Sequence, residues 1–97
     1  MALVGSRKYD VNTGQVISVS GTAASSGVLL TDNEQYVLSV TVDVWFRTDG
    51  SAAVVGTAGS HFLAKGATDV TGSGATISVI KHTGEADGTA SIARGAL

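Results

Sequence analysis

The side chains that could carry chemistry are two histidines and eight carboxylates. A catalytic or metal site would need the histidines to converge with carboxylates, but His61 and His82 show no HxH, HxxxH or HExxH spacing. Most of the carboxylates fall in expected turns, where an aspartate bonds its own backbone. We therefore predict no catalytic residue and no metal ligand, with both histidines at strand ends. Zinc shared between subunits is the alternative.

Motifs for covalent or cofactor chemistry are also missing from the sequence. No GxSxG occurs, and no P-loop. The run Gly72-Ser73-Gly74 precedes an expected strand instead of a helix, so it does not match a dinucleotide-binding turn. The chain has no cysteine, which excludes disulfides and thiol catalysis. We predict no cofactor and no enzymatic activity.

One group of polar and aromatic residues stands out inside an expected strand. Asp43, Trp45 and Arg47 occupy alternate positions, so their side chains should share one face. This face would be either a recognition surface or a half-exposed sheet face with a cross-strand ion pair. Because Trp and Arg are enriched at interface hot spots, we predict that these three residues bind a partner.

The strand that would position them has the strongest pattern in the chain. From residue 35 to 47, every second position is apolar and the positions between are mostly polar, which indicates one long strand with one face in the core. The turn Asp49-Gly50 would end it. The predicted core comprises Ile17, Val19, Leu38, Val40, Val42, Val44, Phe46, Ile77 and Val79.

The rest of residues 14–97 reads as short strands separated by turn signals. We expect strands near residues 15–21, 28–31, 52–55, 61–64, 68–71, 75–81 and 89–94, with a loop at 22–27. This spacing predicts an all-β fold: a single antiparallel β-sandwich or jelly-roll-like domain of seven or eight short strands. An OB-like barrel is the structural alternative.

Residues 1–13 have no periodicity, and we interpret them as an N-terminal arm. The arm combines apolar anchors with basic residues on an otherwise acidic chain, and we expect it to order only against a neighbour. A frayed terminus is the alternative. The partner-binding candidates of the arm are Leu3, Val4, Arg7, Lys8 and Tyr9.

Charge and length limit the classes of partner. A net charge of −2 argues against nucleic-acid binding through bulk positive charge. No apolar segment approaches the length of a membrane span, and the start lacks the order of a signal peptide, so we expect a protein of the cytoplasm or of a particle assembled there. Because 97 residues support only a thin core, we also expect a homo-oligomer, either a dimer or a trimer.

Part of the sequence resembles small structural proteins of tailed-bacteriophage virions. The resemblance lies in the aromatic–Arg run at residues 44–53, a glycine-rich loop, the run at 61–66, the strand at 77–81 and the closing run at 88–92. It implies a capsid decoration or cement protein in the virion, bound to the major capsid protein or other virion proteins. A head–tail connector or tail component is the next possibility. The contrasting class is a carbohydrate- or ligand-binding β-module in which Trp45 stacks on a sugar.

Overall fold

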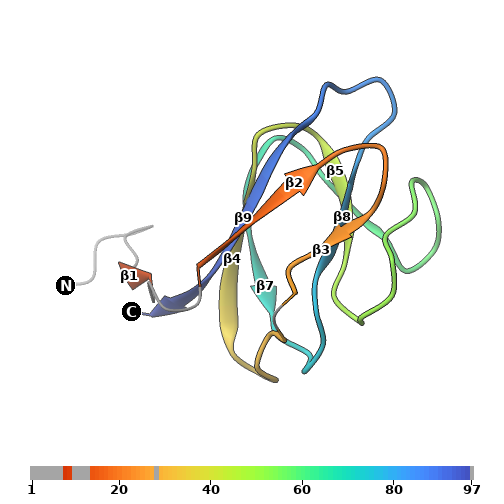
Figure 1. Cartoon of the computed structure of the whole chain (residues 1–97). Coiled ribbons are helices and arrows are strands. Elements are labelled where there is room, and N and C mark those ends of the chain that lie inside the picture. Colours follow the sequence, from red (N-terminus) through yellow and green to blue (C-terminus); the bar gives the residue numbers. More distant parts are fainter. Residues whose placement is uncertain (1–7, 10–13, 28, 97) are drawn as a thin grey trace.

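The computed structural model describes residues 8–9, 14–27 and 29–96, and its regular elements are all strands. The chain folds as a β-sandwich of two antiparallel sheets, which confirms the predicted fold class (Figure 1). The strands are β1 (Lys8–Tyr9), β2 (Gln15–Val19), β3 (Ala24–Ser25), β4 (Gln35–Val40), β5 (Val44–Arg47), β6 (His61–Leu63), β7 (Gly66–Thr71), β8 (Ser78–Lys81) and β9 (Gly88–Ala96).

The first sheet has the order β2-β9-β4-β7, and β1 pairs with the end of β9. β9 lies at its centre, with Ile17 of β2 opposite Ala90 and Leu38 of β4 opposite Ile92. β1 and the last residues of β9 extend away from the body of the sandwich (Figure 1).

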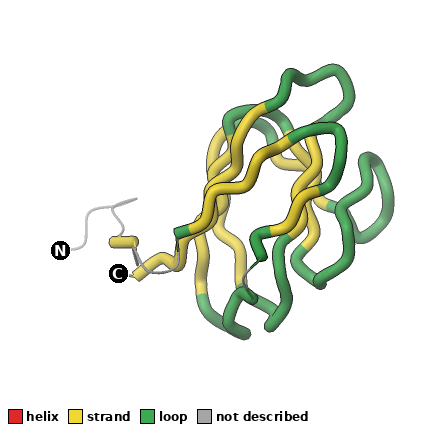
Figure 2. The backbone as a smooth tube through the Cα atoms, in the orientation of Figure 1, coloured by secondary structure: helices red, strands yellow, loops and turns green. Residues whose placement is uncertain are grey.

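The second sheet has the order β3-β8-β5-β6. Consecutive strands from β2 onward change sheet, except for β5 and β6, which are joined by the long loop 48–60 within one sheet (Figure 2). The inward side chains of both sheets form one core. Its buried members are Ile17, Val19, Leu30, Tyr36, Leu38, Val40, Val44, Val70, Ile77, Val79, Ala90 and Ile92, with Val42 and Phe46 partly buried against them.

The single long strand predicted over residues 35–47 is wrong, although its apolar face is inward throughout. The chain bends at residues 41–43, so β4 belongs to the first sheet and β5 to the second. Thr41 holds the bend, because its backbone N–H donates to the carbonyl of Thr89 at 3.0 Å and its hydroxyl accepts from the Thr89 N–H at 2.9 Å. Gly88 makes room for it: a Cβ there would lie 2.5 Å from the Thr41 hydroxyl oxygen.

Three other strand assignments also differ from the prediction. The expected loop 22–27 contains β3, whose Ala24 lies opposite Val79. The expected strand 28–31 is irregular at its described residues, where Leu30 is fixed by a bond from its N–H to the Ala75 carbonyl at 3.0 Å. The expected strand 52–55 is part of the loop 48–60. In all three places the tertiary contacts override the local pattern.

Candidate functional site

The outer face of the second sheet carries an aromatic cluster, defined here as Trp45, Phe62 and His82. Trp45 on β5 lies directly opposite Phe62 on β6 and Ile80 on β8. The ring centroids of Trp45 and Phe62 are 5.5 Å apart, and those of Phe62 and His82 are 5.4 Å apart, both edge-on. Phe62 is 48% exposed, whereas Trp45 and His82 are half-buried. The cluster is therefore an apolar surface that is partly open to solvent.

A hydrogen bond fixes the indole ring within this cluster. The Nε1–H of Trp45 donates to Nδ1 of His82 at 3.0 Å. Nδ1 is the acceptor in this bond, which places the N–H of the imidazole ring on Nε2. The backbone N–H of His82 in turn donates to the carbonyl of Asp43 at 2.9 Å. The aromatic cluster is thus held in one arrangement by both side-chain and backbone bonds.

Asp43 joins three segments at the edge of this cluster. Its carboxylate Oδ1 accepts from the backbone N–H of Lys65 at 2.8 Å. Its own N–H donates to the Glu85 carboxylate at 3.0 Å. Through these bonds Asp43 ties the bend before β5 to the turn before β7 and to the turn after β8. The Asp43 carboxylate is therefore already hydrogen-bonded within the fold, to the backbone of Lys65.

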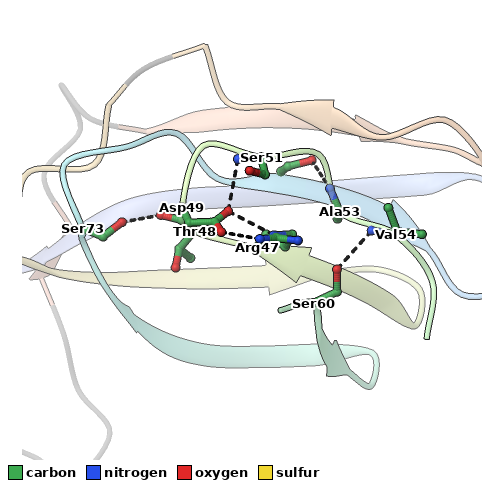
Figure 3. Close-up of polar contacts among 9 residues, drawn as sticks. Arg47, Thr48, Asp49, Ser51, Ala53, Val54, Ser60 and Ser73 are labelled. Atoms are coloured by element: carbon green, nitrogen blue, oxygen red, sulfur yellow. Dashed lines mark hydrogen bonds and ion pairs between the residues drawn. The ribbon is translucent and has the colours of Figure 1, made fainter. Parts of the chain in front are cut away.

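Arg47 forms an ion pair with Asp49 at the other end of β5 (Figure 3). Both nitrogens Nε and Nη2 of Arg47 donate to the carboxylate, and the Ser51 N–H also donates to it. The hydrogen bond from Arg47, followed by that from Ser51, lowers the pKa of Asp49 from 3.8 to about 2. The same ion pair raises the pKa of Arg47. The carboxylate thus stays ionised throughout the neutral range.

The three residues predicted to form one patch therefore engage three different partners. Asp43 bonds Lys65, Trp45 bonds His82, and Arg47 bonds Asp49. Their alternation along the chain is as expected, but of the three only Trp45 belongs to the aromatic cluster. The outer face at Trp45 is extended by Phe62, whereas at Arg47 it is covered by the loop 48–60.

The loop 48–60, whose hydrogen bonds are drawn in Figure 3, folds back over the start of β8. Ser78 occupies an outward-facing position opposite Arg47, yet it is only 4% exposed. Its hydroxyl accepts the N–H of buried Ala53 at 2.9 Å. A second bond within the loop runs from the N–H of Val54 to the hydroxyl of Ser60 at 3.1 Å. The loop thus covers one half of this face and leaves the aromatic cluster open on the other half.

We predict that Ser78→Ala lowers the free energy of unfolding by about 1–3 kcal/mol, because it leaves the buried Ala53 N–H without an acceptor. Ser60→Ala is the matched control, since it removes the acceptor of an exposed N–H that water can satisfy, and we expect a change below about 0.5 kcal/mol. Urea unfolding followed by circular dichroism measures both. Equal losses in the two variants would contradict the closure of the loop over Ser78.

The arm candidates are only partly within the described residues. Lys8 and Tyr9 form β1, with Lys8 opposite Ala96 and Tyr9 opposite Gly95 of the same chain. Leu3, Val4 and Arg7 lie outside the described residues. The described part of the arm therefore pairs with its own chain's β9.

Sequence reasoning missed Phe62 and His82 as companions of Trp45. Phe62 lies in a strand that was expected, and its alternation with inward Leu63 predicts an outward ring. The sequence carries no register, however, so nothing in it places β6 and β8 on either side of β5. Only the pairing of residues between strands would have shown that Phe62 and His82 lie beside Trp45.

The described residues offer neither a metal site nor a membrane-spanning helix. Among the described residues, no group of three or more His, Asp or Glu side chains could hold a metal ion. The described part of the chain contains no helix that is long and apolar enough to cross a membrane. His61, the second histidine, packs its ring against Phe46 with centroids 5.7 Å apart. A scan against known protein families, a search of curated proteins and a search of solved structures each found no match to this chain.

Proposed function

We propose that this protein is a structural component of a tailed-phage particle, a capsid decoration or cement protein that docks through the aromatic cluster. The observation that carries the proposal is the partly exposed Phe62 beside Trp45 on a regular sheet face. Aromatic side chains held rigidly by their neighbours lose little entropy on binding and dominate interface energies. The resemblance of residues 44–53 and 61–66 to virion proteins includes these two residues.

The partner in this proposal is the major capsid protein or another virion protein, and the site of action is the assembled virion. The copy number of the chain in purified particles tests the assignment. On the order of hundreds of copies fits decoration of the capsid lattice, whereas about six or twelve copies fits a ring-shaped connector. Its absence from the particles would overturn the virion assignment.

We expect Phe62→Ala to weaken binding to undecorated particles by more than about tenfold, because it removes an exposed aromatic anchor without touching the core. Val16→Ala is the matched control, since Val16 is 77% exposed on the other sheet. Binding is measured by co-sedimentation with particles. Deletion of residues 2–12 tests the arm separately. If the deletion abolished binding and Phe62→Ala left it unchanged, the arm would be the docking element instead.

The second candidate function is a carbohydrate-binding module. The observation that favours it is the same pair of rings, because an aromatic ring open on a flat sheet face can stack on a sugar. Trp45 is the only tryptophan, so its fluorescence reports directly on this face. A saturable fluorescence change with a glycan, lost in Phe62→Ala, would support this function over particle docking.

A further inference from the structure

β7 presents the longest regular edge on its side of the sandwich. Within the described strands it pairs only with β4, and all six of its residues are in continuous register from Gly66 opposite Val40 to Thr71 opposite Gln35. The neighbouring edge strand of the second sheet, β6, has three residues. The outer side of a six-residue edge strand presents backbone N–H and C=O groups that can template another strand.

The usual devices that protect such an edge are few in β7. The strand contains no lysine, no proline and no interruption of its register with β4. Gly66, Ala67, Asp69 and Thr71 are all exposed, and they are short, so a second strand could approach to the normal spacing of about 4.8 Å. The single charge in the strand is that of Asp69. Lys65 directly precedes the strand and is also exposed.

We propose that β7 pairs antiparallel with β7 of a second copy of this chain, about a two-fold axis at Thr68. Residues directly opposite each other in an antiparallel ladder lie on the same face of the sheet. In a symmetric pair of β7 strands, one residue must therefore lie opposite its own copy, and the two-fold axis passes between the two. An axis at Asp69 would set two aspartates directly opposite each other, which is unfavourable. An axis at Thr68 sets Thr68 against its symmetry mate and Ala67 against Asp69, and a Thr–Thr pair is favourable.

This register also has complementary charges at both ends. Lys65 lies in the bend directly before β7, where the ladder continued by one residue would place it opposite Thr71 of the other copy, with its long side chain diagonal to Asp69 there. The two-fold axis repeats this pair. Within one chain Lys65 lies in the bend before β7, and Asp69 is three residues, or about 10 Å, along the strand from Gly66, so we expect the two charges to meet across the interface. The dimer joins the first sheets of two copies into one.

Charge reversal tests the proposal on the isolated chain, without any particle, so its outcome is independent of the proposed function. The native protein should show a concentration-dependent mass of twice 9.7 kDa in sedimentation equilibrium. Asp69→Lys alone and Lys65→Asp alone should each weaken dimerisation by about tenfold, because each creates two like-charge pairs. The double variant Lys65→Asp/Asp69→Lys should restore it, since the diagonal pairs are then opposite in charge again.

Ser18→Lys is the matched control, because it places a lysine at an exposed position on β2, the other edge of the same sheet. It should leave dimerisation unchanged. Thr68→Cys offers a second readout in a chain that has no cysteine of its own: oxidation should give a disulfide-linked dimer, and Ser18→Cys should not. Circular dichroism verifies that each variant is folded. A native chain that is monomeric at all concentrations overturns the proposal, as does a double reversal that fails to restore the dimer or a folded Thr68→Cys that does not cross-link.

Discussion

Replacing Gly72 with alanine is expected to lower the free energy of unfolding by about 3 kcal/mol or more, a large part of the stability of a domain of this size. A Cβ at Gly72 would lie 2.0 Å from the carbonyl oxygen of Thr31. The Thr31 segment cannot recede easily. The Thr31 N–H donates to the Tyr36 hydroxyl at 2.8 Å, and the Gly72 N–H donates to the Glu34 carbonyl, also at 2.8 Å.

Gly21→Ala is the matched control for this substitution. The nearest atom to a Cβ at Gly21 is a Lys81 side-chain carbon at 3.8 Å, which is ordinary van der Waals contact, and its backbone is not in the left-handed region. We expect this variant to be as stable as the native chain or up to about 1 kcal/mol more stable, because alanine restricts the unfolded chain. Urea unfolding compares the two. A Gly72→Ala variant as stable as Gly21→Ala would show that Thr31 does not approach Gly72 closely.

Leu38→Ala is expected to lower the free energy of unfolding by about 2–5 kcal/mol, through the lost transfer free energy of the side chain and the cavity left behind. Leu38 is fully buried, with 0% exposure, at the middle of β4. It lies opposite Ile92 of β9 on one side and Thr68 of β7 on the other, so the cavity would open at the centre of the first sheet.

Leu29→Ala provides the comparison for Leu38→Ala, because Leu29 loses the same atoms from a position that is 64% exposed. Its effect should be within about 0.5 kcal/mol of zero. Thermal unfolding monitored by circular dichroism measures both variants. Similar losses of stability at the two positions would contradict the placement of Leu38 in the core.

The burial of side chains in this domain was largely predictable from the sequence, whereas the path of the backbone was not. The alternation from Tyr36 to Phe46 correctly predicts which side chains face inward, because the bend at residues 41–43 keeps the same face turned to the core. Alternation cannot show that the chain passes from one sheet to the other at this bend. The bend requires Thr41 to pack closely against Gly88, which is more than forty residues away along the chain. β3 was missed because Ala24 and Ser25 are small residues without apolar contrast.

For the candidate site, the sequence predicts the face on which the side chains lie but not most of their bonding partners. The sequence places Trp45 on an outward face, and the structure confirms that its ring is on the outer side of the second sheet. The partners of Asp43, Trp45 and Arg47 could not be predicted in the same way. The bond from Trp45 to His82 depends on the register between β5 and β8, which no local pattern encodes. The pair Arg47–Asp49 is local and was the one partner within reach of sequence reasoning.

The position of β9 at the centre of the first sheet has a consequence for how fast the domain folds. β9 follows every other described strand in the chain and pairs with β1, β2 and β4. Val19 pairs with Gly88, and nearly seventy residues of chain separate them. This pair can form only when that long loop closes. Loops of this kind must be closed at an entropic cost before the sheet gains any stability, and sandwiches dominated by them refold in milliseconds to seconds. We therefore expect folding to be slow for a chain of this length, because no earlier segment can complete the first sheet before β9 is present.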